Sequence, residues 1–70
     1  MKNVITMNKT NFIKYLQGVN DDVIYYRIRQ KDFTAKFAMK VLRNTPYEMS
    51  DFDCDGEVYA ILKFEKQEPV

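Results

Sequence analysis

Apolar positions in the first half of the chain follow two different periods. Val4 and Ile5 indicate a short first strand. Over about residues 10–18 the apolar side chains recur at helical spacing, and Gly18 suits the end of a helix. Residues 23–29 are β-branched and aromatic, and they alternate between two faces as a strand does. The pattern therefore predicts a strand, a helix and a second strand in this order.

Residues 33–43 fit either a strand or a helix. As a strand, the segment would have every odd-numbered position apolar. As a helix, it would gather Lys36, Lys40 and Arg43 on one face, with Asp32 as an acceptable N-cap. A hairpin with the preceding strand favours the strand, and the helix stays open as the alternative.

The last third of the chain predicts a short helix and a final strand. Thr45-Pro46-Tyr47-Glu48 has the form of a capping box with proline at the first helical position. Met49 and Phe52 would face the core from this helix, which would end at Asp55-Gly56. Residues 57–64 then alternate as a strand does, and the inward positions would be Val58, Ala60, Leu62 and Phe64.

These elements predict one compact α+β domain over residues 1–70. We expect a small antiparallel sheet of three to four strands with two helices packed on one face. If residues 33–43 form a strand, the element order βαββαβ fits a ferredoxin-like arrangement. Residues 67–70 are expected to be a frayed tail.

The composition limits how this domain can be stabilised. Seventy residues with one cysteine and no histidine cannot form an internal disulfide, and a zinc site is not expected. Five tyrosines and five phenylalanines must therefore supply much of the core. The unpaired Cys54 and the lack of an apolar leader predict a reducing, cytoplasmic setting without a membrane segment. A homodimer remains open.

An acidic segment near the C-terminus resembles the first half of a calcium loop. Its pattern is Asp51-x-Asp53-x-Asp55-Gly56, but Leu62 stands where the closing bidentate glutamate belongs. We therefore predict neither a metal site nor a cofactor. The acids are expected to form an acidic lobe that binds a protein partner, consisting of Glu48, Asp51, Asp53, Asp55 and Glu57.

Catalysis has little support in the sequence. Without histidine the usual base near neutral pH is missing, and no nucleophile motif or phosphate-binding glycine loop is present. We expect a protein that is not an enzyme.

Basic and tyrosine side chains form the second candidate surface. With residues 33–43 as a strand, one open sheet face would carry Tyr25, Arg27, Arg29, Lys36, Lys40, Tyr59 and Lys63. Cations among aromatic rings suit single-stranded nucleic acid, although the net charge of +1 is far from the usual basic footprint.

Two functional hypotheses follow. The first is a small protein-binding module, because tyrosine and arginine are enriched at interface hot spots and oppositely charged lobes can orient a partner. It would act as a stoichiometric regulator or inhibitor of a host enzyme or nucleoprotein. Chains of this size and composition are common among phages and mobile elements. The alternative is a domain that binds single-stranded nucleic acid through the basic sheet face.

Overall fold

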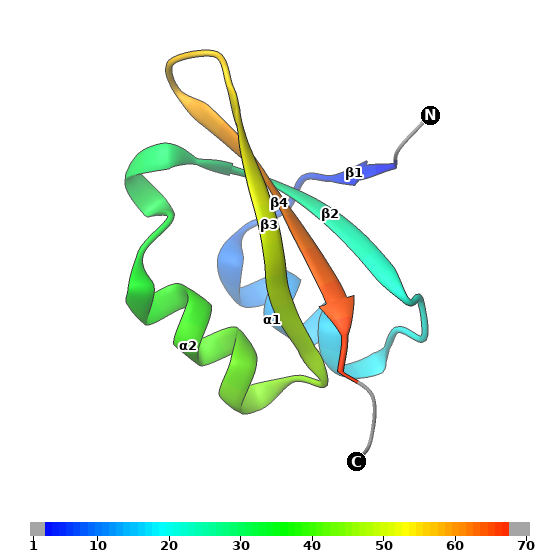
Figure 1. Cartoon of the computed structure of the whole chain (residues 1–70). Helices are drawn as coiled ribbons and strands as arrows, with labels where there is room; N and C mark the ends of the chain where they lie inside the picture. Colours follow the sequence, from blue (N-terminus) through cyan, green and yellow to red (C-terminus); the bar gives the residue numbers. More distant parts are fainter. Residues whose placement is uncertain (1–2, 68–70) are drawn as a thin grey trace.

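Two helices and a four-stranded sheet make up the computed structural model, which describes residues 3–67 (Figure 1). Its class is α+β, as the sequence predicts. Neither helix in this part of the chain is long and apolar enough to cross a bilayer. The elements are β1 (Val4–Ile5), α1 (Lys9–Gly18), β2 (Val23–Arg29), the short 3₁₀ turn η1 (Gln30–Asp32), α2 (Ala35–Asn44), β3 (Tyr47–Asp55) and β4 (Tyr59–Lys66).

The sheet is mixed, with the strand order β1-β2-β4-β3. β1 pairs parallel to β2 because α1 crosses between them, whereas β2 with β4 and β4 with β3 are antiparallel. The order of elements is βαβαββ, which differs from the ferredoxin-like βαββαβ order. β3 consequently lies at one border of the sheet, opposite β1.

Residues 33–43 belong mostly to a helix, so the favoured strand is wrong here. Thr34 caps α2, because its Oγ1 accepts a hydrogen bond from Phe37 N–H at 3.1 Å. Phe37 and Val41, four residues apart, are buried on the same helix face. Lys36 and Lys40 therefore extend from α2 and are not part of a sheet face.

The helix predicted after residue 44 is instead strand β3. Thr45 ends α2, and its Oγ1 donates a hydrogen bond to the Val41 carbonyl at 2.8 Å. Pro46, directly after this C-cap, has no N–H with which to continue the helix. The Thr-Pro pair, which the sequence suggests as a helix start, therefore marks a helix end.

A bulge hides the alternation of β3 in the sequence. The register with β4 shifts between Met49 and Asp51, so Ser50 is the extra residue. On each side of it, apolar and acidic side chains alternate. Gly56, with φ of 76°, then begins the turn into β4. Val58 in this turn is exposed, so its predicted inward position is wrong.

Stacked aromatic rings form the centre of the core. Phe12 of α1 lies on Tyr26 of β2, with ring centroids 3.8 Å apart and planes 6° from parallel. It also meets Phe64 of β4 at 5.3 Å. Of the inward positions predicted for the last strand, Ala60, Leu62 and Phe64 are confirmed. They are buried together with Ile24, Tyr26 and Ile28 of β2, on one face of its alternation.

Two buried tyrosines connect the core to the loops. The Tyr26 hydroxyl donates to the Met7 carbonyl at 2.6 Å, and the Tyr47 hydroxyl donates to the carbonyls of Val19 and Asp21. Burial raises the pKa of both phenols. The Asp32 carboxylate raises the pKa of Tyr26 further, and the Asp21 carboxylate raises the pKa of Tyr47 further.

The chain end is held against the fold as far as it is described. Gln67 N–H donates to the Pro46 carbonyl at 2.7 Å, and Lys66 N–H donates to the Asp22 carbonyl at 2.9 Å. Of the tail predicted over residues 67–70, only Gln67 is described, and residues 68–70 lie outside the described part of the chain.

We expect the domain to lose stability as the pH rises above about 10. Both phenols titrate near 10.0 in the unfolded chain but higher in the folded one. Above that pH the unfolded chain releases protons that the folded chain keeps, so the free energy of unfolding falls; below it this contribution is fully present. Urea unfolding of wild type and Tyr47→Phe between pH 7 and 11 measures the effect.

Tyr47→Phe should be less stable at pH 7, by about 1 kcal/mol for the lost hydrogen bonds, and should show a shallower alkaline decline. The two proteins differ only in this phenol, so the difference between the two slopes reports it. Identical slopes would contradict the raised pKa of Tyr47.

Candidate interaction surface

Within residues 3–67, one face of the sheet carries no helix, and this face divides into a basic and an acidic side. Both helices pack on the opposite, inner face (Figure 1). Pairing aligns the open-face residues of β2, β4 and β3 in four rows. Three rows lie between the bulge and the turn: Arg29, Tyr59 and Asp55; Arg27, Ile61 and Asp53; and Tyr25, Lys63 and Asp51. The fourth, beyond the bulge, is Val23, Glu65 and Glu48. The cations of β2 therefore face the acids of β3 across β4.

The predicted acidic lobe and the predicted basic sheet face thus lie partly on the same face of the sheet. Tyr25, Arg27, Arg29, Tyr59 and Lys63 share the open face as predicted, and the register adds the aspartates of β3 to that same face. Lys36 and Lys40 instead line a hollow between α2 and α1, next to Lys9. Glu48 lies beyond the bulge, and Glu57 lies in the β3–β4 turn. The open face is consequently of mixed charge and not uniformly basic.

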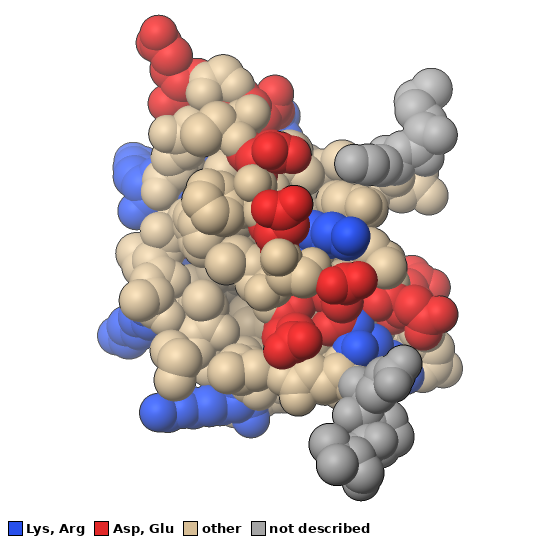
Figure 2. Space-filling view, in the orientation of Figure 1, with Lys and Arg blue, Asp and Glu red and all other residues tan. Residues whose placement is uncertain are grey.

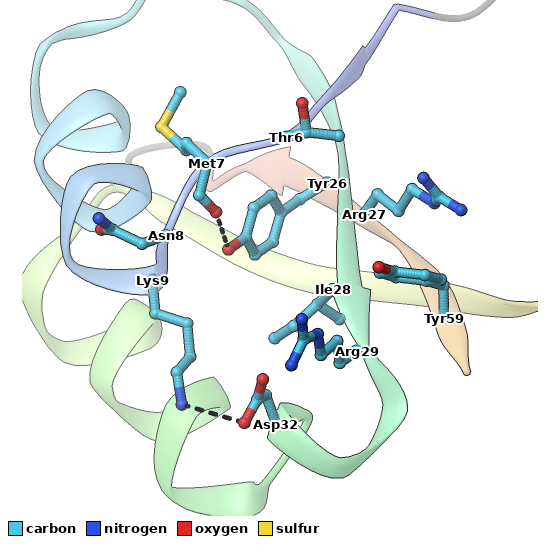
Figure 3. Close-up of a pocket in the computed structure, with 10 residues that line it drawn as sticks. All are labelled: Thr6, Met7, Asn8, Lys9, Tyr26, Arg27, Ile28, Arg29, Asp32 and Tyr59. Atoms are coloured by element: carbon cyan, nitrogen blue, oxygen red, sulfur yellow. Dashed lines mark hydrogen bonds and ion pairs between the residues drawn. The ribbon is translucent and has the colours of Figure 1, made fainter.

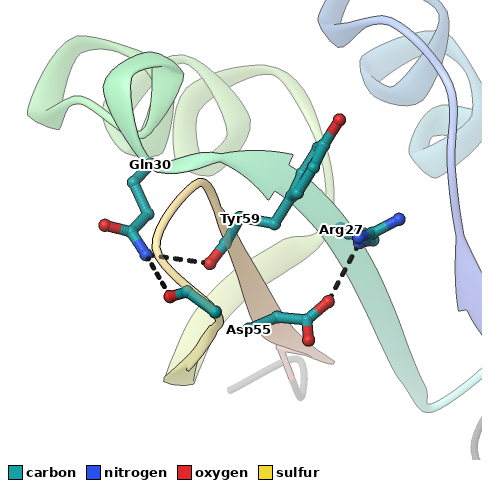
Figure 4. A network of polar contacts seen from close by, with 5 residues as sticks. Arg27, Gln30, Asp55 and Tyr59 are labelled. Carbon is teal, nitrogen blue, oxygen red and sulfur yellow. Dashed lines mark hydrogen bonds and ion pairs between the residues drawn. The ribbon is translucent and has the colours of Figure 1, made fainter.

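Arg27 is already engaged with neighbours on this face (Figure 4). Its Nε lies 3.0 Å from Asp55 Oδ2, and its guanidinium carbon lies 3.9 Å from the centre of the Tyr59 ring. The ring of Tyr59 thus supports a cation that reaches across β4 to β3. Lys63 Nζ similarly lies 3.9 Å from Glu65 Oε1. These contacts use up part of the positive charge that a nucleic acid would need.

Gln30 fastens the β3–β4 turn to the end of β2 (Figure 4). Its side-chain Nε2 donates to the carbonyls of Gly56 at 3.1 Å and Tyr59 at 3.0 Å. Its backbone N–H also donates to the Val58 carbonyl at 2.7 Å. Three hydrogen bonds from one residue therefore fix the position of the turn. The sequence gives no sign of this role.

The border of the sheet at β3 presents acidic residues on one side and apolar residues on the other. We define the β3 edge surface as Asp51, Asp53 and Asp55 on the open-face side with Phe52 and Cys54 on the inner side. All five are exposed. Figure 2 shows acidic side chains along β3, and an uncharged area separates them from the basic side chains at the border beyond α2.

Phe52 is the most unusual member of this surface. Its side chain is 51% exposed, in contrast to the core position that the sequence predicts. It meets the half-buried Phe33 with ring centroids 5.4 Å apart. A large apolar ring is therefore held in place at the border of the sheet while half of it faces solvent. The alternation of apolar and acidic residues over 51–55 is the signal that could have revealed it.

An open cleft of about 560 Å³ lies at the opposite border of the sheet (Figure 3). It is formed by the start of α1 and by β2, and its walls include Lys9, Arg29 and Asp32. Lys9 Nζ lies 4.0 Å from Asp32 Oδ1, so the charges in this cleft partly compensate one another.

The aspartates of β3 do not surround one point. Alternate residues of a strand are about 6.6 Å apart along one face, so the three carboxylates form a row. Among residues 3–67 no three acidic or cysteine side chains lie close enough together to hold a metal ion.

Comparison of the chain with protein-family models, with curated proteins and with solved structures finds no match. The candidate surface therefore has to be judged on its geometry and chemistry.

We expect Gln30→Ala to destabilise the domain more than Asp55→Asn does. The first removes two hydrogen bonds from a half-buried amide and leaves two carbonyls without this donor, a cost of about 1–2 kcal/mol. The second breaks an ion pair whose partners are 40% and 48% exposed, which costs about 0–1 kcal/mol. Urea unfolding gives both values.

Amide hydrogen exchange provides a second readout for these variants. In Gln30→Ala the amides of the β3–β4 turn should exchange faster, while those of α1 should change only with global stability. Equal destabilisation by the two substitutions, without faster amide exchange at the turn in Gln30→Ala, would show that the Gln30 hydrogen bonds do not fix the turn.

Proposed function

We propose that this protein is a non-catalytic protein-binding module and that the β3 edge surface is its contact surface. The observation that carries the proposal is Phe52, an aromatic side chain 51% exposed and supported by the ring of Phe33. Aromatic residues, phenylalanine among them, are enriched at protein interfaces, and hot-spot side chains typically fill a well-packed pocket of the partner. Because Phe33 already restrains the ring, ordering it on binding costs less entropy.

The charges around Phe52 indicate what kind of partner fits. Asp51 and Asp53 flank it in the strand, and the Asp53 side chain has no hydrogen bond or ion pair within residues 3–67. Such a row favours a partner with a basic surface, and it orients that partner as the two proteins approach. A stoichiometric regulator or inhibitor that masks a basic surface of another protein is the activity consistent with this arrangement.

Single-stranded nucleic acid is the second candidate. The observation in its favour is Arg29, whose side chain forms no ion pair in the described part of the chain and lines the cleft beside Tyr59. The acidic row on the same sheet face opposes a polyanion, which is why this candidate ranks second.

We expect Phe52→Ser to abolish partner binding while the fold is kept. The immobilised domain would be incubated with extract from the organism that encodes it, and the bound proteins would be quantified by mass spectrometry. The matched control is Val4→Ser, an exposed apolar residue in β1, at the far border of the sheet. A true partner should be retained by wild type and Val4→Ser and depleted more than tenfold by Phe52→Ser, in keeping with a hot spot. Titration calorimetry with the purified partner then gives the stoichiometry.

Equal capture by all three proteins would show that the β3 edge surface is not the contact. Fluorescence polarisation with single-stranded oligonucleotides at low and moderate salt addresses the second candidate. Tight binding that Arg29→Glu abolishes and Phe52→Ser leaves intact would favour nucleic acid over a protein partner.

A further inference from the structure

The border at β3 is a long strand with one unpaired side. β3 has nine residues and pairs only with β4 among residues 3–67. At the other border, β1 covers β2 over two residues, Val4 and Ile5. An unpaired border strand offers a row of backbone N–H and carbonyl groups to another extended chain. Beyond the bulge, Asp51 to Asp55 keep a regular register with β4. Phe52 N–H donates to Asp51 Oδ1 at 2.8 Å, and an added strand would replace this local hydrogen bond.

A second copy of this chain is a poor occupant of that edge. Pairing of β3 with β3 of another molecule would place open-face side chains opposite open-face side chains. Because Asp51, Asp53 and Asp55 are the open-face residues there, every such pair would join two carboxylates. Like charges directly opposite one another destabilise a sheet, so this edge selects against its own sequence.

The two sides of the edge require different side chains from an occupant. On the open-face side it meets the aspartates, and on the inner side it meets Phe52 and Cys54. α2, which packs against β3, carries two further exposed apolar side chains, Met39 at 44% and Leu42 at 43%. In the view of Figure 2 this inner side is the uncharged area between β3 and the basic border.

We propose that β3 binds an extended segment of a partner protein by β-strand addition, and that this segment alternates basic and apolar residues. Backbone hydrogen bonds to residues 51–55 would supply the sheet pairing, while the alternation would place lysines or arginines opposite the aspartates. The apolar residues would cover Phe52. This inference rests on the proposed protein-binding function and specifies how the partner is held.

The same pattern also directs the segment to one border of the sheet. At the opposite border β2 carries Arg27 and Arg29 on the open face, so a basic segment would be repelled there. The bulge at Ser50 further limits regular pairing to the half of β3 near the turn.

The test uses a capped synthetic peptide of alternating lysine and valine, Ac-KVKVKVK-NH₂, titrated into the isotopically labelled full chain. NMR should show shifts confined to residues 51–55 and their neighbours, and the amides at this edge should exchange more slowly with solvent. Asp53→Lys should weaken binding more than tenfold, because no residue within 3–67 competes for the Asp53 carboxylate. Glu57→Lys, the matched charge reversal in the turn, should change affinity less than threefold.

Two control peptides separate strand addition from simple charge attraction. The peptide Ac-KKKKVVV-NH₂ has the same charge without the alternation, and an N-methylated version of the first peptide lacks alternate backbone donors. Both should bind at least tenfold more weakly. If all three bind alike, or if none binds, strand addition is wrong. If extract proteins are nevertheless lost with Phe52→Ser, the protein-binding function stands with another mode of contact, whereas equal capture would overturn both.

Discussion

The stack of Phe12 on Tyr26 is the contact on which the rest of the fold depends. A chain of seventy residues without a disulfide must obtain its stability from packing, and these two rings join α1 to the central strand of the sheet. With Tyr26 fixed, its hydroxyl holds Met7 and therefore the connection between β1 and α1.

The length of the helices limits how much of the sheet they can cover. Each ten-residue helix is about 15 Å long, whereas the nine-residue β3 extends about 30 Å. The turn end of the β3–β4 hairpin consequently projects past the helices, as Figure 1 shows, and Phe52 is exposed there.

Segments whose local pattern agreed with their environment could be predicted from the sequence. Residues 23–29 alternate because one face packs on the core, and α1 has a buried stripe at helical spacing. Residues 45–55 could not be predicted in this way. Thr45-Pro46 has the chemistry of both a helix start and a helix end, and only the position of α2 decides between them. Ser50 shifts the phase of β3, so a continuous alternation breaks in the middle of the strand. Pairing with β4 overrides the local signal there.

The candidate site was predicted in composition but not in arrangement. The acids of residues 48–57 and the basic residues of β2 were identified as surfaces, but the sequence does not show that a sheet register places them on one face. That outcome depends on β4 lying between β2 and β3, which is a pairing between segments far apart in the sequence. Phe52 was missed for a related reason. A large apolar residue is normally expected in the core, and its exposure follows from where the helices end, which no pattern within residues 51–55 encodes.

An uncovered border strand creates a problem of selectivity, and the residues of β3 address it from both sides. Aggregation through such an edge is usually prevented by charges, bulges or short strands, and β3 has the first two. The negative charge of β3, however, repels only those chains that are also negatively charged. A row of aspartates repels another copy of itself and polyanions, yet it attracts a basic segment more strongly than a neutral edge would. If protection alone were the purpose, a polar residue at position 52 would serve better than phenylalanine, because the exposed ring adds an apolar contact to the very edge that the aspartates protect. The combination of a repulsive row with an exposed ring therefore matches an edge that excludes most strands and retains an affinity for one class.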